Sequence, residues 1–172
     1  MSPDIFMDDF ERTEWGDSHY AVVGRALAFA ARFEKNAKSL SALVKFRRNL
    51  SLMGSDEEIE AFFANISQTP LAEHLKEMGL NEGTARETLK DARLARNEVA
   101  HELALGMDRC VDLLPEESMK GMLGAAKQLG IRLAKGDAII CLLMSAANSE
   151  PIPSRAFFDE YPERVVTWIS EI

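Results

Sequence analysis

The sequence predicts an all-α fold, a single-domain bundle of five to seven helices. The chain has 172 residues, of which 47% are hydrophobic and 8% aromatic. That composition favours helices, at a length that usually forms one domain. Apolar residues recur at three- and four-residue spacings, and no segment alternates with period two for long enough to be a strand. We expect an N-terminal arm over residues 1–17 and one helical domain over residues 18–172.

Charge is unevenly distributed along the chain. The formal net charge is −8, which argues against a surface built entirely for nucleic acid. Residues 17–50 nevertheless carry more positive than negative side chains: Arg25, Arg32, Lys35, Lys38, Lys45, Arg47 and Arg48 against Asp17 and Glu34. The sequence therefore leaves room for a local basic face on an acidic protein.

The cysteine content and the apolar runs indicate where the protein acts. Cys110 and Cys141 are too few for a disulfide framework and do not match a zinc spacing, so we expect no metal and no cofactor. The acidic N-terminus lacks the apolar centre of a signal peptide. The longest apolar run, 138–147, is about half the length that a membrane span needs. We expect a cytoplasmic protein without a membrane partner.

Capping signals place the first helices. A long amphipathic helix is expected over 18–50, with Asp17 as its N-cap. Ser55 and Glu58 fit a capping box that opens a short acidic helix over 56–66.

Two further helices precede the middle of the chain. Thr69 and Pro70 have the pattern of an N-cap and a first helical residue, which predicts a helix over 70–78. A long helix follows over 81–105, where Gly106 ends it. We expect this helix and the first one to be the two longest and to pack as neighbours.

The C-terminal third predicts three more helices, over 115–134, 138–148 and 162–172. Lys135-Gly136-Asp137 has the composition of a turn, with Asp137 as the next N-cap. Pro162 is expected to start the last helix, because proline is favoured at the first helical position. Short connections between these elements favour antiparallel neighbours in a bundle.

The expected helix over 81–105 divides into three faces at 100° per residue. The apolar face holds Ala85, Leu89, Ala92, Val99 and Leu103, and the acidic face holds Glu87, Asp91, Glu98 and Glu102. The third face is basic and polar: Arg86, Lys90, Arg93, Asn97 and His101. Arg96 lies apart from it, at the edge of the apolar face. A guanidinium there must reach water or find a partner, because an unpaired buried charge is costly.

The segment Leu94-Ala95-Arg96-Asn97-Glu98-Val99-Ala100-His101 resembles the signature of HEPN domains. That signature is Arg, four to six residues, then His, often with Asn after the Arg and Ala before the His. The resemblance implies a small helical bundle that forms homodimers. It also implies a metal-independent endoribonuclease of the toxin–antitoxin or phage-defence type, with a site shared by two motif helices. Leu103 stands where antitoxin-modified toxins of this kind often have Tyr, so that mode of regulation is not expected.

The residue chemistry suits RNA cleavage on its own terms. RNA supplies the nucleophile, its 2′-hydroxyl, so the site must accept a proton and stabilise charge. The imidazole of His101 can move the proton near neutral pH, and the Arg96 fork can hold the phosphorane oxygens. Asn97 could orient the ring or bind the phosphate. We expect RNA as the partner, bound along Arg86, Lys90 and Arg93.

Other interpretations remain open at this stage. The same basic face fits a non-catalytic binding module, such as an antitoxin, adaptor or regulator, and charged helix faces are often merely solvated. A regulatory protein or antitoxin is a further possible partner. Leu94 and Leu105 lie off the apolar face, which favours a two-fold dimer that covers them. His74 is expected on a short surface helix without a catalytic role.

Overall fold

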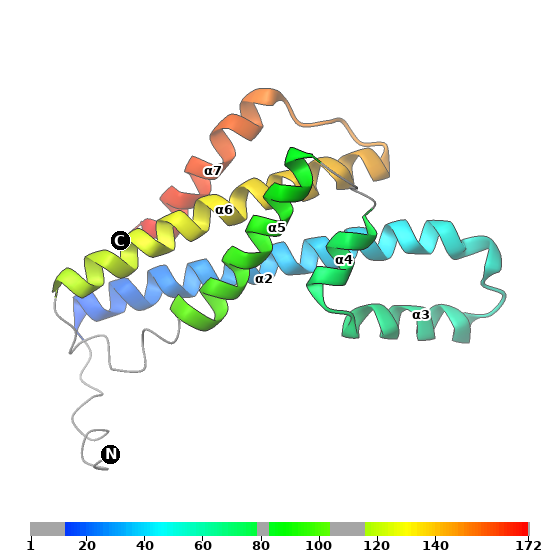
Figure 1. Cartoon of the computed structure of the whole chain (residues 1–172), viewed down its shortest axis with the longest axis horizontal. Coiled ribbons are helices and arrows are strands. Elements are labelled where there is room, and N and C mark those ends of the chain that lie inside the picture. Colours follow the sequence, from blue (N-terminus) through cyan, green and yellow to red (C-terminus); the bar gives the residue numbers. More distant parts are fainter. Residues whose placement is uncertain (1–12, 79–82, 104–115, 172) are drawn as a thin grey trace, which may run out of the picture.

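The computed structural model describes residues 13–78, 83–103 and 116–171 (Figure 1). These residues form helices and contain no strand, so the all-α prediction is confirmed. The six α-helices among them are α2 (Glu14–Asn49), α3 (Asp56–Gln68), α4 (Leu71–Glu77), α5 (Thr84–Asn97), α6 (Glu116–Asn148) and α7 (Arg155–Ser170). A short 3₁₀ turn, η1 (Leu50–Leu52), follows α2, and a π-helical segment, η2 (Glu98–Leu103), continues α5. None of the described helices is long and apolar enough to cross a membrane.

Helices α2 and α6 run side by side and form the centre of the bundle (Figure 1). Helix α5 crosses both of them, α7 packs on α6, and α3 and α4 lie beside the C-terminal half of α2. The core between these helices includes Phe33, Leu40, Leu89, Leu133 and Ile169, each almost inaccessible to solvent. The long first helix and its packing against the motif helix are therefore as expected. The two longest helices are α2 and α6, however, with 36 and 33 residues.

Helix α6 is continuous, and the turn expected at residues 135–137 is wrong. Gly136 lies where α6 meets α2 and α5, and a Cβ built on it would come within 2.3 Å of the Ala92 Cβ and 3.1 Å of the Phe33 ring. The Asp137 carboxylate accepts hydrogen bonds from side chains of other helices. The residues that resembled a turn are thus required for close helix packing and for a buried polar contact.

Two helix starts differ from the expected ones because another residue supplies the cap. Helix α2 begins at Glu14, since the Thr13 hydroxyl accepts the Gly16 N–H at 3.0 Å, and Asp17 already lies inside the helix. The expected arm over 1–17 is therefore too long at its C-terminal end, and its first twelve residues lie outside the described part. Helix α7 begins at Arg155, where Ser154 accepts the Phe157 N–H. Pro162 lies inside that helix.

Helix α4 begins after Pro70, and the Thr69 hydroxyl donates back to the Asn65 carbonyl instead of capping α4. His74 on this helix is fully buried, so its expected surface position is wrong. Its Nδ1 lies 2.9 Å from the Ser41 hydroxyl and its Nε2 lies 3.1 Å from the Ile66 carbonyl oxygen. A carbonyl only accepts, so Nε2 carries the proton and the ring fastens α4 to α2.

The capping box before α3 is present in a modified form. The Ser55 hydroxyl accepts the Glu58 N–H at 3.3 Å, as expected. The Glu58 carboxylate accepts from the N–H of Gly54, one residue earlier than in the standard box. Helix α5 starts after Gly83, whose φ of 106° suits glycine. The expected stop at Gly106 lies outside the described residues.

Candidate functional site

Each face of the motif helix contacts a different neighbour. The apolar face is buried as expected, with Leu89, Ala92 and Val99 almost inaccessible. The acidic face is directed to α6, where the Arg132 guanidinium donates to Asp91 at 2.9 Å and to Glu98 at 2.8 Å. These contacts fix the rotation of α5 and η2 about their axis. They leave Arg96 on the side of α2 and the basic face toward α4 and solvent.

The change from α to π geometry occurs inside the Arg96–His101 motif. Helix α5 ends at Asn97, and η2 runs from Glu98 to Leu103 with His101 in its middle. In an α-helix, residues five apart are about 140° from each other around the axis. A π turn holds more residues, so each one advances less. Arg96 and His101 are therefore closer around the axis than the sequence predicts for an α-helix.

Arg96 is held by an acidic side chain of α2. One of its terminal nitrogens forms an ion pair with the Glu34 carboxylate, and the other donates to the Asn97 side-chain oxygen at 3.3 Å. Lys38 also contacts Glu34, at 2.8 Å. Burial raises the pKa of the Glu34 carboxyl, but the Lys38 hydrogen bond and the Arg96 charge outweigh burial and hold that pKa below its ordinary value. Arg96 therefore has the partner that its position required.

A groove of about 560 Å³ opens beside this ion pair, between α2 and the motif helix. We call it the α2–α5 groove; its lining includes Arg96, Glu34, Lys35, Lys38 and Ala100. Two cations, Arg96 and Lys38, thus pair with the Glu34 carboxylate, and a third, Lys35, lines the same groove. The Arg96 side chain keeps 27% of its accessible surface, so an anionic ligand could reach the guanidinium from solvent.

The three residues of the expected RNA-binding face are gathered in a second groove. Arg86, Lys90 and Arg93 line a cavity of about 420 Å³ between α4 and α5, together with Lys76 from α4. The Lys90 ammonium lies 3.9 Å from the Glu87 carboxylate, and both side chains are largely exposed. The structure therefore brings the expected basic residues to one concave surface and adds a fourth cation.

His101 is exposed and does not line the groove that Arg96 lines. The structure thus places Arg96 beside Asn97, with His101 on the next turn at the surface. Leu94 is 40% exposed, as expected for a residue that a partner would cover. Leu105, the other leucine of that expectation, lies outside the described residues.

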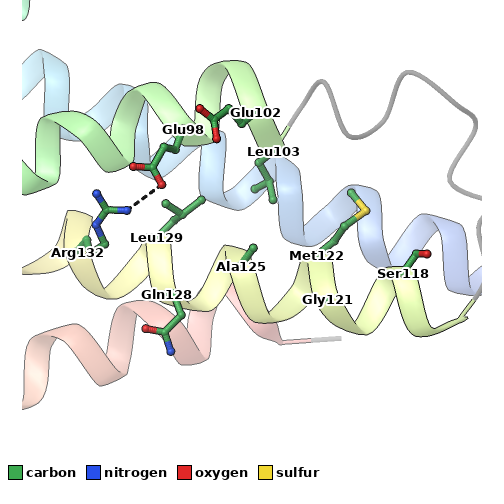
Figure 2. A pocket seen from close by; sticks show the side chains of 10 residues that line it. All are labelled: Glu98, Glu102, Leu103, Ser118, Gly121, Met122, Ala125, Gln128, Leu129 and Arg132. Atoms are coloured by element: carbon green, nitrogen blue, oxygen red, sulfur yellow. Dashed lines mark hydrogen bonds and ion pairs between the residues drawn. The ribbon is translucent and has the colours of Figure 1, made fainter.

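The opposite side of η2 faces an apolar cavity. About 550 Å³ lies between η2 and the N-terminal half of α6 (Figure 2). Leu103, Met122 and Leu129 give it an apolar floor, and Glu98 and Glu102 line its edge. Arg132 also lines this cavity and pairs with Glu98, so Glu102 is its acidic residue without a cation partner among the lining residues, whereas cations predominate among the charged residues of the α2–α5 groove.

Four residues of these grooves were not expected from the sequence: Glu34, Lys35, Lys38 and Lys76. One usable signal was Glu34 itself, an acidic residue within a strongly basic helix. The others contact the site only through the packing of α2 and α4, which local patterns do not specify.

One chain thus presents an anion-binding guanidinium, a polar amide and an exposed imidazole within two turns of one helix. These groups can bind a phosphate and transfer a proton if a second surface brings them to the same ligand. A comparison of the chain with protein-family models, curated proteins and solved structures finds no match.

Proposed function

We propose that the protein is a metal-independent endoribonuclease whose site is completed at a homodimer interface. The observation that carries this proposal is the arrangement around Arg96. Its guanidinium faces a solvent-open groove with Lys35 and Lys38, one helical turn before an exposed imidazole. π-helical segments are rare and often occur at functional sites. Here the π segment contains His101 of the HEPN-like motif.

The proposed reaction uses the 2′-hydroxyl of RNA as the nucleophile. His101 accepts the hydroxyl proton, the 2′-oxygen attacks the phosphorus, and the bond to the 5′-oxygen of the next nucleotide breaks. A protonated imidazole, that of the second copy, donates a proton to this leaving oxygen. Arg96 neutralises the negative charge that grows on the non-bridging oxygens. The products are a 2′,3′-cyclic phosphate and a 5′-hydroxyl.

The cations around the motif supply the RNA path. Lys76, Arg86, Lys90 and Arg93 form a concave basic surface on the motif helix, N-terminal to Arg96. Such a surface binds phosphates without reading sequence. An acidic chain can therefore bind RNA, because positive charges are concentrated on this local surface.

A second copy of the chain would complete the site. His101 and Leu94 are both exposed on the motif helix, and a two-fold contact of these helices would bring two His101 side chains and two Arg96 side chains toward one substrate. We place the enzyme in the cytoplasm, as a toxin or phage-defence effector that an antitoxin or regulatory protein restrains.

The cavity between η2 and α6 favours a second candidate, a non-catalytic binding module. Its apolar floor and the acidic side chains Glu98 and Glu102 suit a protein segment that carries apolar and basic side chains. In this alternative the motif helix holds a partner and does not cut RNA.

Incubation of purified protein with total RNA in EDTA separates the two candidates. We expect wild-type protein to cut, and His101→Ala and Arg96→Ala each to lower cleavage by roughly 100-fold or more. Asn97→Ala should have a smaller effect. His19→Ala is the matched control for a lost imidazole, since His19 contacts Trp15 at the start of α2.

Product ends and substrate chemistry give a second readout. The cut RNA should carry 2′,3′-cyclic phosphates, and an all-deoxy oligonucleotide should stay intact. A fully active His101→Ala protein, or cleavage of the deoxy substrate, would show that the proposed mechanism is wrong.

A further inference from the structure

Another groove lies between α2 and α7, on the side of α2 away from the α2–α5 groove. It has a volume of about 360 Å³, and residues of α2 and α7 line it. We call it the α2–α7 groove; its lining includes Phe29, Arg32, Tyr161, Arg164 and Trp168. The residues thus combine aromatic rings with two arginines in one open surface, and nothing in the proposed reaction uses them.

Aromatic side chains make up half of the residues that line this groove, and Trp168 is the exposed one among them. Trp168 is 45% exposed, although a side chain of this size is usually covered. The Phe157 and Tyr161 rings line the same groove and stack on each other, with centroids 5.0 Å apart. The Tyr161 hydroxyl donates to the buried Asp137 carboxylate at 2.5 Å, which fixes the ring in place. A rigid aromatic surface is what a stacked nucleobase requires.

The two arginines of the groove each keep more than half of their side-chain surface exposed. The Arg32 side chain is 56% exposed; it lies over the Phe29 ring and 3.6 Å from Asp137. The Arg164 side chain is 73% exposed and is paired with Glu160 on the same helix at 2.9 Å. The Arg164–Glu160 pair is exposed on both sides and contributes little free energy, so a phosphate can replace the Glu160 carboxylate. Asp137 is fully buried, so Arg32 keeps that contact and offers a phosphate the exposed part of its side chain.

The two grooves that flank α2 belong to one surface. Arg32 lines the α2–α7 groove, and Lys35, three residues further along α2, lines the α2–α5 groove beside Arg96. Small exposed residues, Ala28 and Ala31, lie between the two grooves on the same helix. A single strand with a phosphate at Arg96 would therefore reach the α2–α7 groove by crossing one exposed side of α2, where Arg32 and Lys35 also lie.

We infer that the α2–α7 groove is a stacking subsite for an unpaired nucleobase of the RNA, with Arg32 and Arg164 on the neighbouring phosphates. This inference rests on the proposed function, because RNA is the substrate proposed there. A nucleotide complements both parts of the groove, since its base has a π face and its phosphate is anionic. A base that is paired in a duplex cannot insert between these side chains, so the subsite favours single-stranded RNA.

Tryptophan fluorescence tests the subsite directly. The chain has two tryptophans, so Trp15→Phe leaves Trp168 as the reporter. In a His101→Ala background, which keeps the RNA intact, we expect a short oligouridylate to quench this fluorescence in a saturable manner. Trp168→Ala should weaken binding, measured by fluorescence anisotropy of the labelled RNA, by about tenfold or more, and Trp168→Tyr should restore most of it.

Two arginines of α7 form a matched pair for the phosphate contact. Arg164 and Arg155 are both exposed and both paired with a carboxylate four residues away, but Arg164 lines the groove and Arg155 does not. Arg164→Ala should weaken RNA binding several-fold more than Arg155→Ala. Equal effects would mean that only net charge matters, and would overturn the phosphate assignment.

The remaining outcomes separate this inference from the proposed function. RNA that binds and is cut by otherwise wild-type protein, with no quenching of Trp168, would overturn the subsite alone. Quenching without cleavage would leave the subsite standing and remove the enzyme. A Trp168→Ala protein that changes from dimer to monomer in light scattering would assign the groove to a second copy instead. Absence of any RNA binding would overturn both.

Discussion

Two polar centres use side chains of α2 that are two residues apart, Glu34 and Asn36. The two centres differ in how deeply they are buried. Asn36 donates to the Asp137 carboxylate at 3.1 Å, and Tyr161 donates to it at 2.5 Å, in a centre where Asp137 is fully buried. Glu34 instead pairs with Arg96 at the solvent-open edge of the α2–α5 groove. Both centres join α2 to another helix.

The difference lies in whether water can replace the partners. Burial raises the pKa of the Tyr161 hydroxyl, and the Asp137 charge raises it further, so this side chain stays protonated and keeps donating. A buried group that loses its partner is left without a hydrogen bond, which costs far more than an exposed one does. The Asp137 centre therefore holds three helices together, whereas the Arg96 centre is only half-buried and lies at the edge of an open groove.

The largest expected effect on stability comes from removing the buried carboxylate of Asp137. Asp137→Ala should lower the free energy of unfolding by about 3 kcal/mol, since Asn36 and Tyr161 lose a buried acceptor. Glu34→Ala, the matched change at the half-buried Arg96 centre, should cost less, about 1 kcal/mol. Urea unfolding followed by circular dichroism measures both. Equal costs at the two centres would contradict the distinction drawn here.

Close packing next to Asp137 gives the second effect. Gly136→Ala should destabilise the protein by about 2 kcal/mol, because the added methyl group meets the Ala92 Cβ and the Phe33 ring. Gly124→Ala on the same helix has open space around its Cβ, and should stabilise by about 0.8 kcal/mol through helix propensity alone. Thermal unfolding of the pair resolves the opposite signs. Destabilisation by both would show that α6 is less regular than described.

If the proposed function holds, the carboxylate of Glu34 competes with RNA for Arg96. Glu34→Gln should tighten RNA binding by about two- to fivefold, because it removes a charge from the groove while keeping the side-chain shape. The measurement is anisotropy of labelled RNA at fixed salt, in the His101→Ala background. Ser39→Ala, in the same groove, is the control. Weaker binding would mean that Glu34 positions Arg96 and does not compete.

The smallest effect concerns pH and the second buried centre, at His74. Burial lowers the pKa of this imidazole in the folded protein. Protonation therefore favours the unfolded chain, so stability is full above the unfolded pKa of about 6.5 and falls as the pH drops below it. We expect His74→Gln to flatten the fall of the unfolding midpoint between pH 7 and pH 5.5. If the unfolding midpoint of His74→Gln falls as steeply with pH as that of the wild type, other titrating groups cause the fall.

The sequence was sufficient for the helices whose signals are local. The apolar face of the motif helix and the serine cap of α3 were expected and are present. The turn expected at Gly136 is absent, because the sequence Gly-Asp is the same whether it ends a helix or makes a close contact inside one. Pro162 was expected to start the last helix and instead lies inside α7. Only the positions of α2 and α5 decide between these possibilities, and those positions depend on the whole fold.

The candidate site shows a similar limit. Arg96 at the edge of the apolar face implied a partner, and the structure supplies Glu34. The sequence did not identify which acidic residue this would be, since 62 positions separate the two. Nor did periodicity indicate the π segment, because a template of 100° per residue already assumes that the helix stays regular up to His101. Whether these residues cut RNA stays a prediction.

The unbroken course of α6 also decides where the chain can be interrupted. An exposed turn at 135–137, as the sequence predicts, would be suited to a domain insertion, a circular permutation or a protease site. The fold places that position at the contact of α6 with α2 and α5, where any added residue would rotate the second half of the helix out of its contacts with α7. The segment from Glu150 to Pro153 is mostly exposed and non-helical, and it is there that a fluorescent reporter or an affinity tag can be inserted without disturbing the bundle.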